Sequence, residues 1–193
     1  MEAKRPTIVL VAVVILIMLG AMGTLASCMG VASVVGQSSL MAMNEQLLAN
    51  SPGGAQQLEA QRAMMAIQAP FMVPQVIGQV LNLLGSVLLI VGAAMLASLK
   101  KSAPNLLLGA AGVCILADLI NTVLGLYIGY ASQSAVETMV QATPDAQQVM
   151  GAAMQATMVL TLIWGIAWFL IKVGIYVFGV YTSRKPEVAQ VLS

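Results

Sequence analysis

Four long apolar stretches alternate with shorter polar segments along the chain. They cover residues 7–36, 75–99, 104–131 and 156–182. A membrane-spanning helix needs about 20 predominantly apolar residues, so each stretch is long enough to cross a bilayer. We therefore predict an all-α membrane protein: a single domain over residues 1–193 in which four transmembrane helices run up, down, up and down.

The two longer connections, 37–74 and 132–155, are polar but rich in helix-forming residues. In the first, a Ser-Pro-Gly-Gly sequence separates two helix-favouring stretches, and Pro70 and Pro74 indicate a break before the second span. In the second, Thr143 followed by a proline is typical of a helix start. We expect both connections to form helical extensions on the outer side of the membrane.

Composition agrees with a chain whose main partner is the lipid bilayer. Hydrophobic residues make up 60% of the sequence and charged residues only 8%, whereas a soluble domain is about one quarter charged. The net charge of +1 and the lack of a basic or aromatic recognition motif exclude an obvious nucleic-acid surface. The sequence has no histidine, no catalytic triad pattern and no carboxylate cluster, so we predict no enzyme activity, no cofactor and no metal site.

The distribution of basic residues predicts an orientation in the membrane. Six of the eight lie in the N-terminal arm, at Lys100 and Lys101, and at Arg184 and Lys185. The two long connections hold only one basic residue, Arg62, against four acidic ones. The positive-inside rule then places both termini in the cytoplasm and both long connections outside. We expect an integral protein of a bacterial plasma (inner) membrane.

The sequence Leu25-Ala26-Ser27-Cys28 offers another interpretation of the first stretch. It follows a basic arm and an apolar run, and resembles a bacterial lipoprotein cleavage box. The apolar sequence nevertheless continues past Cys28 to Val35, which favours an uncleaved first helix. Processing at this point stays an open alternative.

Two charged residues interrupt the apolar stretches, Asp118 in the third and Lys172 in the fourth. At about 1.5 Å per helical residue, Asp118 lies about 21 Å from Pro104 and Lys172 about 18 Å from Arg184. The two side chains thus lie at nearly the same depth on antiparallel helices, and we predict an ion pair inside the bundle. The pair could simply fix the helix register, or Lys172 could extend to the membrane surface. Alternatively, the pair could belong to a proton or ion pathway.

A set of polar residues, here called the polar stripe, follows one face of the second span and the matching level of the third. Its members are Gln75, Gln79, Asn82, Ser86, Asn121 and Thr122. If these faces converge, they form an outward-facing polar vestibule for a small polar ligand, closed below by Asp118 and Lys172. Otherwise they supply interhelical hydrogen bonds, each contributing about 0.6 kcal/mol.

Glycines mark the predicted packing faces of the second and third spans. Gly78, Gly85 and Gly92 recur every seven residues in the second span, and Gly125 and Gly129 form a GxxxG sequence in the third. Glycine lets a neighbouring helix backbone approach closely. We predict that all five lie at helix–helix contacts.

Methionines are concentrated in the outer connections and their flanks, which hold nine of the fourteen. Met150, Met154 and Met158 share one helical face. Thioethers are soft ligands for Cu(I), but methionine is also the flexible filler of adaptable binding surfaces. Without cysteine or histidine nearby, we favour a docking surface for a protein partner and leave copper binding as an alternative.

The plan of four spans with two outer connections resembles that of tetraspanins and claudins. The outer connections lack the cysteine motifs of those families, so the resemblance concerns architecture alone. The sequence therefore suggests a non-enzymatic structural or accessory protein that packs against partner membrane proteins or itself. The alternative is a small transporter or channel-like protein that uses the polar stripe, Asp118 and Lys172.

Overall fold

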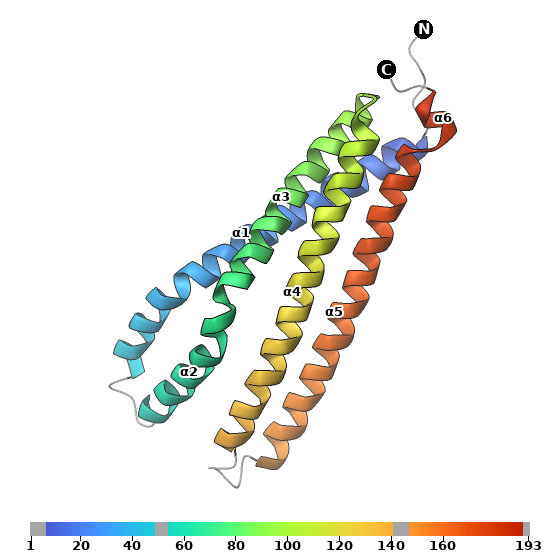
Figure 1. The fold of residues 1–193 in the computed structure, drawn as a ribbon. Helices are drawn as coiled ribbons and strands as arrows, with labels where there is room; N and C mark the ends of the chain where they lie inside the picture. The colour runs from blue at the N-terminus through green and yellow to red at the C-terminus, as the bar shows by residue number, and fades with distance from the viewer. Residues whose placement is uncertain (1–6, 49–53, 141–146, 191–193) are drawn as a thin grey trace.

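The computed structural model describes residues 7–48, 54–140 and 147–190. Every element in this part of the chain is a helix (Figure 1). The elements are α1 (Thr7–Leu48), α2 (Gly54–Gln68), the 3-10 turn η1 (Ala69–Phe71), α3 (Met72–Ala97), α4 (Ala103–Val140), α5 (Gln147–Ser183) and α6 (Pro186–Ala189). The predicted all-α bundle with helical extensions is confirmed.

Four helical stretches are long and apolar enough to cross a membrane, which identifies the chain as an integral membrane protein. They are Thr7–Gly36, Met65–Ala97, Ala103–Ser132 and Val159–Ser183. The second begins well before the predicted start at residue 75, because the apolar sequence continues through the break at η1. Pro70 lies in that 3-10 turn, which joins α2 to α3.

Three of the spanning helices continue beyond their membrane segments, as the sequence predicts. α1 extends to Leu48 without a break at Cys28, α4 extends to Val140, and α5 begins at Gln147, before its span starts at Val159. α2 folds back beside the end of α1, where an ion pair joins Arg62 and Glu45 at 2.7 Å. The predicted helix start at Thr143 lies outside the described residues.

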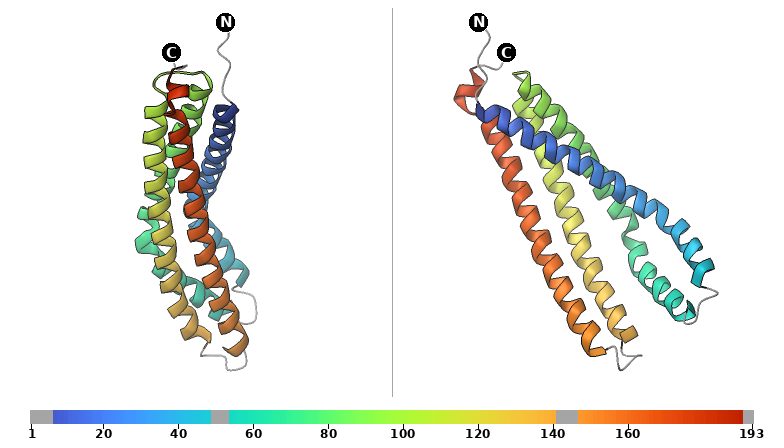
Figure 2. Two further views of the ribbon diagram at one scale, coloured as in Figure 1. Left: turned by 90° about the vertical axis from the view of Figure 1, so that its right-hand side faces the viewer. Right: turned by 180° about the vertical axis from the view of Figure 1, so that it is seen from behind.

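The helices are arranged with α3 between α1 and α4, while α5 lies against the other side of α4. α1 crosses the bundle at an angle. It meets α5 near one end and diverges from it toward the other (Figure 2). The contact between α1 and α5 is close at Gly179, where an added Cβ would lie 2.9 Å from Leu16 Cδ1. Within the described residues, the half of α5 that lies away from Gly179 thus has α4 as its neighbour but not α1.

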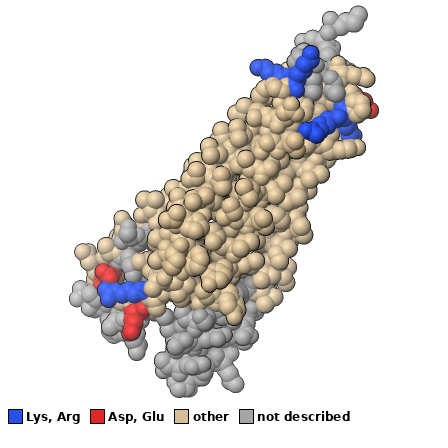
Figure 3. Space-filling model, viewed as in Figure 1, with Lys and Arg blue, Asp and Glu red and all other residues tan. Residues whose placement is uncertain are grey.

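Charged residues lie at the two ends of the bundle on the face in Figure 3, and its middle shows none. We call one end the basic end, defined by Lys100 and Lys101 in the α3–α4 turn and by Arg184 and Lys185 after α5. This separation of charges is expected for a protein whose middle lies in lipid.

The short turn at the basic end fixes α3 and α4 as antiparallel neighbours. Leu99 adopts a left-handed conformation with φ of 55°. Its N–H donates to the carbonyl of Leu96 and that of Lys100 to the carbonyl of Met95, both at 3.0 Å. This pattern is a Schellman motif, which usually has glycine at the left-handed position.

The best-packed part of the core also lies toward the basic end. Leu16 of α1, Leu89 of α3 and Leu107 of α4 are each about 1% exposed. Val188 of α6 is fully buried in the same cluster. α6 therefore closes this end of the bundle and helps to hold the end of α5 in place.

Candidate functional site

Asp118 and Lys172 meet at the interface of α4 and α5. Lys172 Nζ lies 2.6 Å from Asp118 Oδ1. The second carboxylate oxygen of Asp118 accepts a hydrogen bond from the Tyr176 hydroxyl at 3.4 Å, and its backbone carbonyl accepts one from Thr122 Oγ1 at 2.7 Å. The structure thus brings the two charged residues together and adds a phenol to the carboxylate.

The ion pair is shielded from its surroundings. The side chain of Asp118 is 9% exposed and that of Lys172 is 18% exposed, and Tyr176 and Cys114 are buried beside them. An isolated charge in such a place would be costly, but a close pair with a further hydrogen bond is compensated. The geometry can hold α5 against α4.

Sequence reasoning did not anticipate the role of Tyr176. It lies four residues after Lys172, so both side chains project from the same face of α5. A tyrosine one helical turn from a charged residue within a membrane span was therefore the feature of the sequence that could have predicted this contact. Trp164 and Trp168 continue this i, i+4 series toward the N-terminal end of α5 and are both exposed.

The polar stripe divides into two groups in the structure, and the first is buried between α1 and α3. Asn82 Nδ2 donates to Ser27 Oγ at 2.9 Å, and Ser27 Oγ donates to the carbonyl of Gly23 at 2.7 Å. Ser86 is also buried and lies against Gly23. These residues form interhelical packing and hydrogen bonds, with Ser27 of α1 as the partner of Asn82.

The second group lines a polar cavity of about 260 Å³ among α1, α3 and α4. Gln75, Gln79 and Asn121 contribute polar side chains to its wall, together with Ser33 of α1. The predicted vestibule is therefore only partly formed, because Asn82 and Ser86 are not among its lining residues.

Asp118 and Lys172 do not line this cavity either, which contradicts the predicted closure by the ion pair. The reason is the position of α4 between α3 and α5. Asn121 points to α3, where it meets Gly78, whereas Asp118 points to Lys172 of α5. Thr122 donates to its own helix and is likewise absent from the cavity wall.

The seven-residue glycine series lies at the α3–α4 interface. An added Cβ at Gly85 would lie 2.7 Å from Cys114 Sγ, and one at Gly92 would lie 2.8 Å from Leu107 Cδ2. Gly78 faces Asn121 in the same way. At Gly85 the added Cβ would also lie 3.1 Å from the Cys114 backbone nitrogen, so the two helices approach most closely there, whereas Gly78 and Gly92 first meet side-chain atoms.

The GxxxG glycines of α4 behave differently from the α3 series. An added Cβ at Gly125 meets no atom within 4 Å, and Gly125 lines the polar cavity. The predicted packing at this glycine is therefore wrong for contacts within the described chain. Gly129 is half-buried.

The side chains of Met150, Met154 and Met158 lie outside the described part of the structure. Docking of a protein partner and copper binding by this methionine face therefore stay predictions.

Comparison with other proteins gives no family or fold relationship from which to transfer a function. No known protein family, curated protein or solved structure matches this chain, and its function must be inferred from its own geometry.

Proposed function

We propose that the chain is a non-enzymatic accessory protein that assembles laterally with a partner membrane protein or with a second copy of itself. The observation that carries the proposal is the exposure of α5. In the most apolar 18-residue window of each span, 33%, 39% and 33% of the residues are buried in the first three spans, against 6% in the fourth. The fourth helix therefore offers most of its surface to the surroundings.

The outer half of α5 is the candidate assembly surface, defined here by Leu160, Thr161, Ile163, Trp164 and Gly165. Leu160 is 70% exposed and Trp164 is 69% exposed. An added Cβ at Gly165 would meet no atom within 4 Å. This surface combines a large aromatic side chain with a hydroxyl and a glycine.

Those residue types favour a protein partner over lipid alone. Membrane helices associate through small residues that permit close approach and through hydroxyl groups that bond across the interface. Tryptophan is enriched among residues that dominate interface energetics. The shielded Asp118–Lys172 pair supports the same proposal, because it anchors α5 to α4 and does not line the polar cavity.

Site-specific photocrosslinking tests this assembly surface. A benzophenone amino acid replacing Trp164 should give a discrete protein adduct in native membranes. The matched control replaces Leu25 of α1, which is 66% exposed. Leu25 lies about 27 Å from the start of α1, and Trp164 lies about 28 Å from the end of α5, so both residues lie at a similar distance from the basic end. We expect little or no adduct at Leu25, because the proposal assigns that face to lipid.

Two differently tagged copies of the chain distinguish self-association from a separate partner. An adduct carrying both tags identifies a second copy, and one carrying a single tag identifies another protein. Equal adduct yields at both positions, or no protein adduct at Trp164, would contradict the assembly function.

The polar cavity supports a second candidate, a small transporter or channel-like protein for small neutral polar solutes. Gln75, Gln79 and Asn121 supply hydrogen-bond donors and acceptors at its wall. In proteoliposomes, this function predicts faster uptake of urea or glycerol than in empty vesicles, and loss of the difference in Gln79→Leu. An uptake rate equal to that of empty vesicles would argue against it.

We further propose that the basic end faces the cytoplasm of a bacterial cell, with both termini inside. The opposite end carries Glu45, Glu59 and Arg62, so the excess of basic residues lies at one end. A cysteine replacing Glu59 should react with a membrane-impermeant maleimide in intact cells. A cysteine replacing Lys101 should react only after lysis, and the reverse result would invert the orientation.

A further inference from the structure

We propose that a groove between α4 and α5 near the basic end binds an anionic phospholipid. The acyl chain would lie along the apolar wall of the groove, and the phosphate would bind the guanidinium of Arg184. This inference concerns a different face from the polar cavity and does not depend on the assembly function.

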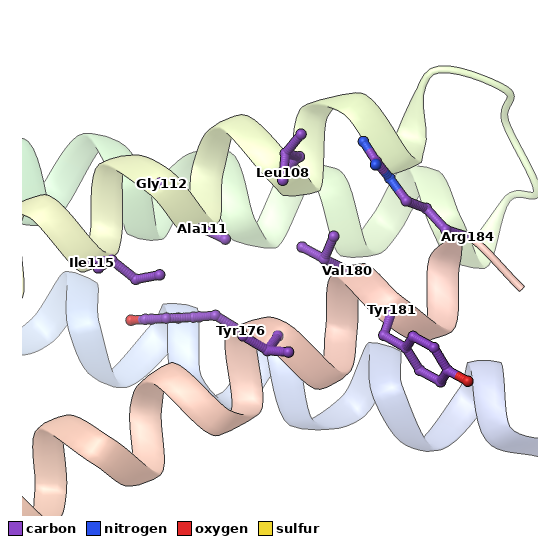
Figure 4. A pocket seen from close by; sticks show the side chains of 9 residues that line it. Leu108, Ala111, Gly112, Ile115, Tyr176, Val180, Tyr181 and Arg184 are labelled. Carbon is purple, nitrogen blue, oxygen red and sulfur yellow. The ribbon is translucent and has the colours of Figure 1, made fainter.

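The groove is apolar along almost its whole length (Figure 4). Its volume of about 400 Å³ falls within the range of small-molecule sites, about 300 to 1,000 Å³. Leu108, Gly112 and Ile115 of α4 form one wall, and Tyr176 and Val180 of α5 form the other. Because these residues belong to two membrane spans, hydrocarbon chains are the solvent available to fill the groove.

Arg184 supplies the charge that distinguishes this groove from an ordinary lipid-facing surface. It is the one charged residue in the lining, and its side chain extends from just after the end of α5 toward α4 at the end of the groove (Figure 4). At 1.5 Å per residue, it lies about 12 Å along the helix axis from Tyr176. A lipid can therefore place its headgroup at the basic end while its chain reaches Tyr176.

The guanidinium of Arg184 is available for such a headgroup. Within the described ranges it has no ion-pair or side-chain hydrogen-bond partner, whereas the neighbouring Lys185 lies 5.5 Å above the ring of Tyr181. The planar fork of arginine matches phosphate oxygens in a bidentate manner. Basic pockets between membrane helices near the surface are suited to anionic headgroups.

The lipid would also contact the residue that supports the ion pair. The ring of Tyr176 lines the groove, and its hydroxyl donates to Asp118. An acyl chain packed on this ring would fill space between α4 and α5 and hold Tyr176 against the carboxylate.

Native mass spectrometry of the protein released from nanodiscs of equal phosphatidylglycerol and phosphatidylcholine content tests the proposal. The wild-type chain should retain phosphatidylglycerol in preference to phosphatidylcholine. Arg184→Gln should lower this preference about fivefold, the effect of losing roughly 1 kcal/mol from one basic residue. The matched control Lys101→Gln removes a charge at the same end but outside the groove, and should keep the preference.

A second pair of variants tests the apolar part of the groove. Added Cβ atoms at Gly112 and Gly109 would each meet no atom within 4 Å, so a side chain can begin at either position without a clash at its first carbon. Gly112→Leu should fill the groove and reduce retention of both lipids, whereas Gly109→Leu, outside the lining, should retain them as the wild type does.

Equal retention of the two lipids by the wild-type chain would overturn the proposal without recourse to any variant. An unchanged preference in Arg184→Gln would also overturn it. So would a wild-type dimer that Gly112→Leu converts to monomer, because the groove would then hold a second copy of the chain.

Discussion

Replacing Lys172 with methionine is expected to lower the free energy of unfolding by about 3 to 5 kcal/mol, the usual cost of breaking a buried ion pair. The variant leaves the Asp118 carboxylate in an apolar interface with only the long 3.4 Å hydrogen bond from Tyr176. α5 then loses its strongest polar contact with α4. Unfolding in mixed micelles with increasing dodecyl sulfate, followed by tryptophan fluorescence, measures the loss.

The double variant Asp118→Asn with Lys172→Met is the control for this prediction. Both partners are then neutral, so no charge remains without compensation, and most of the lost stability should return. Tyr176→Phe is a milder control, because it removes one hydroxyl and should cost about 0.6 kcal/mol. A Lys172→Met protein as stable as the wild type would show that the pair does not hold α5 in place.

The ion pair illustrates what the sequence could predict. The depths of Asp118 and Lys172 follow from the helical rise and from the residues that mark the ends of their spans. The number of residues between each side chain and the end of its span was therefore enough to predict the ion pair. The hydrogen bond from Tyr176 depends on how far α5 is rotated about its axis. Periodicity alone does not determine that rotation for a helix with so little burial.

The polar stripe shows that residue spacing does not predict which neighbouring helix a side chain contacts. All its members lie at the predicted level, but α3 has two neighbours, and its polar face turns partly toward each. Asn82 meets Ser27 of α1, whereas Gln75 and Gln79 join Asn121 of α4 at the cavity. Which helix each residue meets depends on the crossing of α1, and sequence spacing carries no information on that angle.

The glycines of α3 and α4 support the same conclusion. A period of seven identified the α3 face because one neighbour, α4, lies along its whole length. The GxxxG of α4 has the same composition, yet Gly125 faces open space at the cavity. Small residues thus predict that a close approach is allowed, and only the packing determines whether one occurs.

Gly85→Val provides the second large effect, with an expected loss of about 1 to 3 kcal/mol from overpacking. The added Cβ would lie 2.7 Å from Cys114 Sγ and 3.1 Å from the Cys114 backbone nitrogen. A side chain can rotate away, but the backbone of α4 cannot, so α3 and α4 must separate. The change should be measured in the same micelle titration.

Gly109→Val is the matched control, because it makes the same substitution on α4 at a position where an added Cβ meets no atom within 4 Å. Valine has a higher intrinsic helix propensity than glycine, so the control should be at least as stable as the wild type. If Gly85→Val is equally stable, α3 and α4 do not approach as closely as the Gly78, Gly85 and Gly92 series requires. A measured loss at Gly85 alone would support the close α3–α4 contact.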